Sequence, residues 1–447
     1  MIEEVEQARD CVDKLRKRLR EARVHLSYLS GLSYCSDGER LAAAMALDAL
    51  DRRLRRKRRA VRELMNDLET HDLSYDMVTR SVVHFIVGGR VDPFVDWDES
   101  EFRSRTRFNK DGLRDVLAEM KLLPGEIMGK DGSRCPIEQA VMIVLTRLGS
   151  INNWDRMQHL FNAHRSYLIT IFTTTRDVLH DHYGITVTSF DFLRIIPQLP
   201  LWDEVMTSNG DTIPGVVAYI DGKAWRWCRP GPGAYFQNIA HALHLDVSQV
   251  QRAWYNGHYS HHGGKVQHVV FADAMVYTFL DSIRRHDAHV LRSSGVNVML
   301  EQLFIDDPTN NMATVNTRPA YGYGDTAYPT DGHVIAYPSG PQRATLTNAA
   351  CEAHTATNRH RIVVEDSFQI HVAMWPLANR FTVHSLAQNG QGSFPDLYKL
   401  WNVMVLFTNL RTCITGSQIS GITGIDPPTV AGYLANTNNG VQQLTVL

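Results

Sequence analysis

The fold is decided by a short apolar run, Val216-Val-Ala-Tyr-Ile220, that ends in Asp221 and Gly222. A continuous apolar run of this length is typical of a buried strand. Upstream of it, apolar residues recur at helical spacing, and downstream short strand-like and helix-like segments alternate. We therefore expect an α/β domain over residues 211–412, with Asp221 at the end of its first strand.

The segments after this strand predict a mixed sheet flanked by helices. The expected strands are Val266–Phe271, Met275–Leu280 and one ending near Gly324-Asp325. The expected helices are Ala288–Leu303, Asn358–Trp375, which Pro376 ends, and Leu397–Leu410. The order of strands and helices fits an α/β class.

The chain before residue 211 reads as helical. Residues 1–75 predict two helices that form a basic hairpin or coiled-coil arm, and residues 76–105, with Gly88-Gly89 and Pro93, predict a linker. Residues 106–210 predict a helical domain whose last helices are Ile137–Leu148, Trp154–Phe161 and Ser166–Tyr183. The tight turn Asn162–Arg165 between the last two suggests a helix-turn-helix-like DNA-binding unit, with a plain helical bundle as the alternative.

The C-terminal residues 413–447 predict a polar tail. From residue 401 onwards the chain holds one Arg, one Asp and no Lys, and Asp426-Pro-Pro428 predicts a loop. Packing back on the body, packing on a second subunit and disorder all remain open for this tail.

Composition excludes several protein classes. The chain has 447 residues, of which 44% are hydrophobic, 21% charged and 9% aromatic, which is typical of globular proteins rather than disordered or fibrous ones. No apolar stretch reaches about 18 residues, so we expect no transmembrane helix. The N-terminus lacks the apolar core of a signal peptide, and the six scattered cysteines form no CxxC pair, so we expect free thiols in a reducing compartment.

Charge is distributed unevenly along the chain. Residues 14–62 hold 15 Lys and Arg against 5 Asp and Glu, a net of +10, so the remainder must carry −12 of the total of −2. Eight basic residues fall within Asp51–Arg62. Such a run beside an acidic body suggests a nucleic-acid contact or a nuclear-import signal, with a solvated helical face as the alternative.

Three acidic residues stand where chemistry is expected. Asp221 and Asp325 follow expected strands, and Glu365 lies on the expected helix Asn358–Trp375. Three carboxylates in one cleft repel each other unless cations neutralise them, and Mg²⁺ prefers such oxygen ligands. The alternative is that each acid is a helix cap or an ion-pair partner, as Arg361 and Glu365 would be at i,i+4.

Five motifs then occur in order, and together they resemble the catalytic domain of PIF/Harbinger transposases and their domesticated nuclease relatives. They are Ile220-Asp221-Gly222; Tyr255-Asn-Gly-His-Tyr-Ser260 with Lys265-Val-Gln267; His286-Asp287 with Ser293-Ser-Gly295; Tyr323-Gly-Asp325-Thr-Ala-Tyr-Pro329; and Asn358 with Arg361-Ile-Val-Val-Glu365-Asp-Ser-Phe368 and Trp375. Two departures touch positions that contact DNA in the family. Lys223-Ala224 replaces Thr-His after the first motif, and Gln369-Ile-His371 replaces Gly-x-Leu-Lys after the last.

The resemblance implies an RNase H-like fold in which Asp221, Asp325 and Glu365 form a DDE triad. It implies two Mg²⁺ or Mn²⁺ ions, cutting of DNA phosphodiester bonds, and transfer of the resulting 3′-OH end to target DNA. It further implies a homodimer or higher oligomer, a Myb-like DNA-binding partner protein and action in the nucleus, with no membrane association. Two alternatives are a domesticated DNA-binding or scaffold protein without catalysis, and an RNA-directed nuclease on the same fold.

Other residues are candidates for supporting roles. The expected DNA-binding residues are Arg52, Arg53, Arg55, Arg56, Lys57, Arg58, Arg59, Lys223, Lys265 and Arg361. His258, His261, His262 and His268 predict either a hairpin that touches DNA phosphates or, less readily, a zinc site. In one interpretation Asp273 and Asp287 contribute acidic groups to the active-site cleft. In the other, Asp287 caps the helix that follows it. Trp225 and Trp227 either stack on an unpaired base or pack in the core. No motif for ATP or NAD binding is present.

Overall fold

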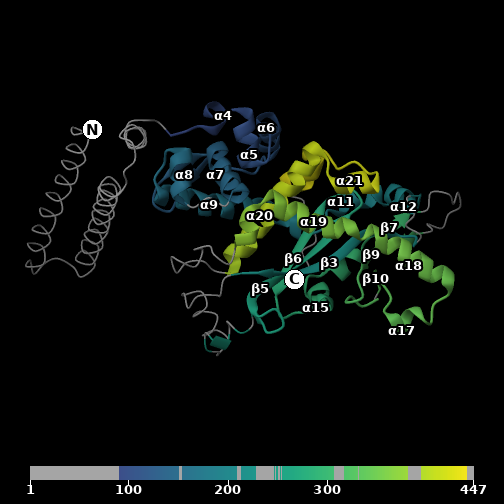
Figure 1. Cartoon of the computed structure of the whole chain (residues 1–447). Helices are drawn as coiled ribbons and strands as arrows, with labels where there is room; N and C mark the ends of the chain where they lie inside the picture. The colour runs from purple at the N-terminus through teal and green to yellow at the C-terminus, as the bar shows by residue number, and fades with distance from the viewer. Residues whose placement is uncertain are drawn as a thin grey trace, which may run out of the picture. The chain divides into compact units, whose positions relative to one another are not determined.

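The computed structural model describes residues 90–150, 154–208, 213–227, 254–306, 317–330, 332–380 and 394–439, together with the single positions 246, 248, 249 and 252 (Figure 1). By its contacts the chain divides into Met1–Arg90 and Val91–Leu447, and the account below concerns the second unit. The expected basic arm and its candidates Arg52 to Arg59 lie outside the described residues. Among those that are described, the cysteines are free, and no helix is long and apolar enough to cross a membrane.

A six-stranded mixed sheet forms the centre of this unit (Figure 1). Its central strand β3 (Val216–Arg226) pairs antiparallel with β5 (His261–Phe271) and parallel with β9 (Tyr321–Gly324). Beyond β9 lies the parallel β10 (Val334–Ala336), while β5 also pairs with β6 (Val276–Ser282) and the short β4 (Tyr255–Asn256). The α/β class with a mixed sheet is therefore confirmed, and the expected hairpin of Val266–Phe271 with Met275–Leu280 is present.

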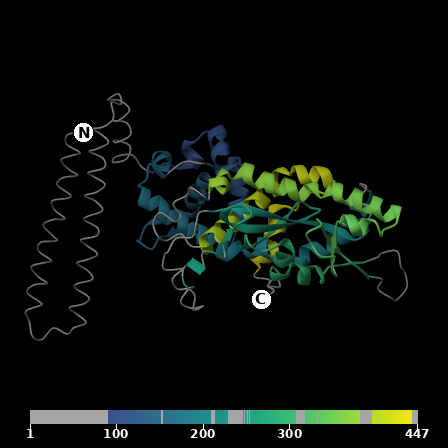
Figure 2. The same ribbon diagram turned by 60° about the horizontal axis from the view of Figure 1, so that its bottom comes forward.

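Helices flank both faces of the sheet. His268 of β5 stacks on Phe368 of α19 (Ile362–Met374), whereas Lys265 of β5 pairs with Asp287 of α15 (Asp287–Ser293). Because successive strand residues point to opposite faces, α19 and α15 cover opposite faces of the sheet. Figure 2 shows α18 (Asn348–His360) and α19, in light green, following one another along the sheet.

Strand β3 is longer than the sequence indicates. It continues beyond Asp221 to Arg226, because the ladder with β5 extends as far as the pair Arg226 and Gly263. Asp221 therefore lies inside a strand and not at its end, which corrects the expectation.

Two expected helices are each divided in two. Gly295, with φ of +72°, separates α15 from α16 (Val296–Leu300), because a left-handed residue cannot continue a helix. Arg361 separates α18 from α19, since the turns around it are of the i,i+3 kind, with the Arg361 amide bonded to Asn358 O. Helix α18 begins at Asn348, ten residues before the expected start, because Thr347 caps it by accepting from the Ala350 amide at 3.2 Å.

Part of the expected linker is helical. Helices α4 (Pro93–Asp96) and α5 (Glu99–Thr106) form there, and Asp92 and Asp98 cap them with their side chains. Acids that suggest a solvated linker in the sequence thus serve as helix N-caps.

The helices expected further on are confirmed closely. The structure has α6 (Lys110–Glu119), α7 (Ile137–Gly149), α8 (Trp154–Phe161) and α9 (Arg165–Tyr183), with a small β1 (Glu126–Met128) and β2 (Arg134–Pro136) hairpin before α7. Helix α9 packs on α7, α8 and α20 (Phe394–Thr415). Whether α8 and α9 act as a helix-turn-helix stays a prediction.

The remaining elements are short. They are α10 (Ile185–Thr188), α11 (Phe192–Ile195), η1 (Ile196–Gln198), α12 (Leu199–Ser208), β7 (Phe304–Asp306), β8 (Thr317–Pro319), α17 (Gly340–Arg343) and η2 (Pro376–Arg380).

The C-terminal segment packs back on the body through residue 439. Helices α21 (Gln418–Thr423) and α22 (Val430–Asn438) follow α20, and Tyr433 and Leu434 of α22 are buried. Asn436 donates to Asp191 Oδ1 at 2.6 Å, and Asn438 donates to Glu119 O at 2.7 Å. Of the three alternatives for this tail, the described part therefore adopts the first.

Candidate active site

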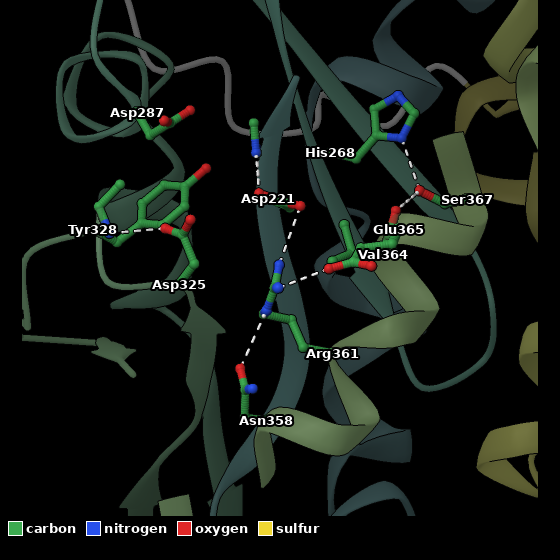
Figure 3. A network of polar contacts seen from close by, with 12 residues as sticks. Asp221, His268, Asp287, Asp325, Tyr328, Asn358, Arg361, Val364, Glu365 and Ser367 are labelled. Atoms are coloured by element: carbon green, nitrogen blue, oxygen red, sulfur yellow. Dashed lines mark hydrogen bonds and ion pairs between the residues drawn. The ribbon is translucent and has the colours of Figure 1, made fainter. Parts of the chain in front are cut away.

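Asp221 faces the helix α19 from the middle of β3 (Figure 3). Its Oδ2 accepts from Arg361 Nη1 at 3.1 Å and its Oδ1 from the Gly222 amide at 2.8 Å, and the side chain is 21% exposed. Burial raises the pKa of the Asp221 carboxyl above its ordinary value, against the opposing effect of Arg361 and the Gly222 amide. The charges of Asp325 and Asp287 raise this pKa further, so Asp221 lies within the field of other acids.

Glu365 joins the same network through Arg361. Arg361 Nη2 lies 2.7 Å from Glu365 Oε1, as the i,i+4 spacing suggested, and Arg361 Nε donates to Asn358 Oδ1 at 3.3 Å. The Arg361 side chain is only 17% exposed, and its guanidinium bridges Asp221 of β3 and Glu365 of α19 (Figure 3). Arg361, expected to bind DNA, is thus engaged within the protein.

Asp325 directly follows β9, as the sequence predicted, and begins a tight turn. The Ala327 amide donates to Asp325 Oδ1 at 2.9 Å, and the Tyr328 amide to Asp325 O at 3.2 Å. A Cβ on Gly324 would lie 2.6 Å from the Tyr328 ring, so only glycine allows this ring to fold back. The Tyr328 hydroxyl then reaches Gln267 Oε1 at 3.5 Å.

Tyr328 lies among the acids and had no role in the sequence argument. Burial raises its pKa well above the ordinary value, and the charges of Asp287, Asp221 and Asp325 raise it further. The buried Tyr328 ring therefore lies in the electrostatic field of three carboxylates (Figure 3). The motif Tyr323–Pro329 contains Tyr328, but nothing in its spacing indicates the contact with Gln267.

Lys265 and Asp287 form a second charged pair on the opposite face of the sheet. Lys265 Nζ lies 2.9 Å from Asp287 Oδ1, and the side chains are 10% and 17% exposed. Lys265, expected to touch DNA, is instead held in the interior by this pair. Asp287 is the first residue of α15 after the N-cap His286, so the expectation that it caps the helix is wrong and the pairing replaces it.

Lys223 and the two tryptophans that follow it differ in their exposure to solvent. Lys223 is exposed, and its Nζ lies 5.6 Å from the Trp225 ring and 5.7 Å from the Phe368 ring. Trp225 donates from Nε1 to Ala378 O at 2.9 Å and is buried, while Trp227 stacks on Trp254. Core packing, the alternative to base stacking, is thus what both tryptophans do, and DNA binding by Lys223 stays a prediction.

His268 lies apart from His258, His261 and His262, which lie at the start of β5 and in the turn before it. His268 is fully buried, bonds Ser367 through Nδ1 at 2.9 Å and stacks on Phe368, whereas His258 lies on the exposed turn after β4. Burial lowers the pKa of His268 well below its ordinary value. Asp273 forms an ion pair with Arg194 at the turn between β5 and β6, away from the triad. In the part of the chain that the structure describes, no group of three or more His, Cys, Asp or Glu is arranged to hold a metal ion.

The donor chemistry of the triad nevertheless fits a hard divalent cation. Asp221, Asp325 and Glu365 offer carboxylate oxygens, and a cation would offset both the burial and the neighbouring negative charges that raise the pKa of Asp221. In this structure Arg361 supplies that positive charge. Arg361 occupies one oxygen of each carboxylate, Asp221 Oδ2 and Glu365 Oε1, so an ion held by those two oxygens would have to displace it.

Comparison with known proteins adds one match. Residues 242–409 match the family model described as DDE superfamily endonuclease, and this stretch contains Asp325 and Glu365 but begins after Asp221. No curated protein and no solved structure shows a significant match to the chain. Enzymes of the DDE family generally use divalent metal ions. The similarity of residues 242–409 to this endonuclease family, in a mixed α/β fold, supports a DDE transposase or nuclease function for the chain.

Proposed function

We propose that the chain is a metal-dependent DDE transposase or endonuclease of the PIF/Harbinger type, with Asp221, Asp325 and Glu365 as its catalytic triad. The observation that carries the proposal is that Arg361 bridges Asp221 of β3 and Glu365 of α19, while the charge of Asp325 at the end of β9 also acts on Asp221. These acids come from three separate sequence segments, and two of them lie in the stretch that matches the endonuclease family.

The triad would hold two Mg²⁺ or Mn²⁺ ions. Ions held there would supply the activation of a water molecule and the charge stabilisation that an in-line displacement at phosphorus needs. The water oxygen would bond to phosphorus, the bond from phosphorus to the 3′ oxygen would break, and a proton of the water would pass to that oxygen, which leaves a 3′-OH end and a 5′-phosphate. In strand transfer the same 3′ oxygen attacks a target phosphorus, and the leaving 3′ oxygen of the target takes up the proton.

The surrounding residues position the triad. Gln267 and the Gly324 turn hold Tyr328, which fixes the loop that carries Asp325. Arg361, once released from Asp221 and Glu365, lies at the right place to neutralise the scissile phosphate. Lys223 and the basic residues Arg52 to Arg59 would bind flanking phosphates.

The assembly follows from the reaction. Joining two DNA ends requires two active sites, so we propose a homodimer or a larger oligomer. A Myb-like partner protein and a nuclear location belong to the same proposal, through the resemblance to PIF/Harbinger transposases.

A second candidate function is a DNA-binding or scaffold protein without catalysis. The bridge from Arg361 to Asp221 and Glu365 favours it, because this bridge satisfies the two carboxylates without any metal.

Cleavage of labelled linear DNA tests the two candidates against each other. We expect the full chain to cut in Mg²⁺ or Mn²⁺, Asp325→Ala to abolish cutting, and Asp426→Ala, which removes an exposed acid in a distant loop, to cut normally. Equal cutting by wild type and Asp325→Ala would remove the triad assignment. Binding without cutting by all three proteins would favour the scaffold function.

A further inference from the structure

We propose that the surface at one end of the sheet binds an unpaired DNA strand beside the cleavage site. This surface is formed by the turn between β4 and β5 and by the ends of β3 and β6. This inference rests on the proposed function, because it assumes that DNA is the substrate. It adds a surface that distinguishes single-stranded from double-stranded DNA next to the cut.

The first part of this surface is the aromatic hairpin, which we define as Tyr255–His262. Tyr255 and Tyr259 are 40% and 45% exposed, and no other tyrosine in the described ranges is exposed to this degree. The Tyr259 ring stacks on His261 at 5.8 Å between centroids, and His258 packs edge-on to it at 5.1 Å. The hairpin therefore presents ordered aromatic faces to the outside.

The hairpin is held in place by its own backbone and by the neighbouring turn. Asn256 Oδ1 accepts from the His258 amide at 2.9 Å, and Asn256 Nδ2 donates to Ile283 O at 3.0 Å. Gly263 N donates to Trp254 O at 2.9 Å. Rings that are already ordered lose little conformational entropy when a base stacks on them, which makes them effective stacking platforms.

The second part is the basic edge, which we define as Arg226, Arg252, Arg284 and Arg285. All four are exposed. Arg226 ends β3 opposite Gly263, at the base of the aromatic hairpin, and Arg284 bonds Arg252 O at 3.5 Å. Two acids lie on this side: Asp281 accepts from Ser293 at 3.0 Å, and Asp246 interacts electrostatically with Arg252. The arginines place positive charge at the same end of the sheet as the aromatic rings.

Exposed rings next to arginines match the chemistry of a single strand. Arginines bind the phosphates, and aromatic side chains stack on bases with little sequence preference. In a duplex the faces of the bases are covered by their neighbours, so the rings gain nothing from it. We therefore assign unpaired DNA, and not duplex, to this surface.

The position of the surface fits the proposed cleavage site. Strand β3 connects Asp221 to Arg226, five residues apart, which is about 17 Å at roughly 3.4 Å per residue. Because β5 runs antiparallel beside it, the aromatic hairpin lies at the same end of the sheet as Arg226. Because Arg226 and Asp221 point to opposite faces of β3, a strand bound at the surface would pass around this end of the sheet to reach the triad.

Binding of the full chain to two fluorescent DNAs tests the inference, without divalent ions so that nothing is cut. One DNA is a blunt duplex, and the other has the same duplex with an unpaired extension. We expect Tyr255→Ala/Tyr259→Ala to weaken binding to the extended DNA about tenfold or more, and binding to blunt DNA by less than about twofold. Phe304→Ala is the control, because Phe304 is 44% exposed on β7, which lies in a separate two-stranded sheet with β8.

Further variants separate stacking from charge and from misfolding. Tyr255→Phe/Tyr259→Phe keeps both rings and should retain the preference for the extended DNA. Arg284→Ser/Arg285→Ser should weaken both DNAs and reduce the salt dependence of binding. An adenine analogue whose fluorescence is quenched by stacking, placed in the extension, should be quenched by wild type and not by the alanine variant.

The results also distinguish this inference from the proposed function. If Tyr255→Ala/Tyr259→Ala lost binding equally to both DNAs, or lost none to the extended DNA, the surface would be overturned even if the chain cuts DNA. Equal or tighter binding of an RNA extension would overturn the assignment to DNA. A selective loss on the extended DNA would support the surface even if the chain proves unable to cut.

Discussion

Arg361 holds the carboxylate of Asp221 at 3.1 Å, although the two residues are 140 positions apart in the chain. The same guanidinium binds Glu365 at 2.7 Å. The bond joins the centre of the sheet to the junction between α18 and α19, so the acids are held at a mutual distance set by an arginine. If the chain has the proposed function, a metal ion and Arg361 would compete for the same two carboxylate oxygens.

Replacing Arg361 should change the response to metal. We expect Arg361→Gln to lower the unfolding free energy without divalent ions by about 1 kcal/mol, because these partly exposed carboxylates lose their counter-charge. Added Mg²⁺ should then stabilise the variant more than it stabilises wild type. Thermal unfolding with and without Mg²⁺ measures both effects. Arg359→Gln, an exposed arginine two residues away, is the control, and an equal Mg²⁺ response in all three proteins would contradict the competition.

The raised pKa of Asp221 should appear in the pH dependence of stability. Native Asp221 keeps its proton to a higher pH than in the unfolded chain, so its contribution is full below the unfolded pKa and is lost as pH rises through the native pKa. Asp221→Asn has no titrating carboxyl at this position, so the variant does not lose this stability as pH rises. Without divalent ions, the variant should therefore gain stability relative to wild type as pH rises from about 4 to about 7. Denaturant titrations at several pH values measure the difference, and a difference that is flat or falls with pH would refute the assignment.

The pair of Lys265 and Asp287 should behave as a coupled unit. Lys265→Met leaves a largely buried carboxylate without its partner, and we expect a loss of about 2 kcal/mol in unfolding free energy. Lys265→Met/Asp287→Asn should lose less than the sum of the two single variants. Urea unfolding of the four proteins gives the coupling energy. Additive losses would show that the two side chains act independently.

Gly222 should tolerate no side chain. A Cβ there would lie 1.8 Å from Asp287 Oδ1, so Gly222→Ala must displace the carboxylate from Lys265, and we expect a loss of about 2 kcal/mol or more in unfolding free energy. Gly257→Ala serves as the control, since nothing lies within 4 Å of its added Cβ. If both variants unfold at the same denaturant concentration, the close approach of Asp287 to β3 is wrong.

Local patterns predicted much of the fold because they report on local physics. The apolar run Val216–Ile220 and the spacing of Trp154–Phe161 each indicate their element directly, and both elements are present. The turn chemistry of Gly295 could have been used to divide the helix Ala288–Leu303. The acids of residues 92–98 were ambiguous, since the same side chains suit a solvated linker and a helix N-cap.

Pairings across the sheet were beyond reach from sequence. The i,i+4 rule gave the contact of Arg361 with Glu365, but the second contact of Arg361 with Asp221 depends on how α19 lies on β3. The burial of Lys265 likewise depends on α15, which brings Asp287 to it from the other face. The extension of β3 to Arg226 needed the ladder with β5, which is a long-range property.

The contacts that anchor α22 limit where the chain can be truncated. Its asparagines complete the hydrogen bonds of Asp191 and of the Glu119 carbonyl, two groups of the helical region, while Tyr433 accepts from Asn409 of α20 at 2.8 Å. The sequence suggested that the catalytic domain ends at residue 412. A fragment that stops there would remove hydrogen-bond partners from both the helical region and α20. The helices before β3 and the sheet behind it are therefore tied together by the C-terminal segment, and we expect a fragment that lacks α22 to be less stable than the full chain.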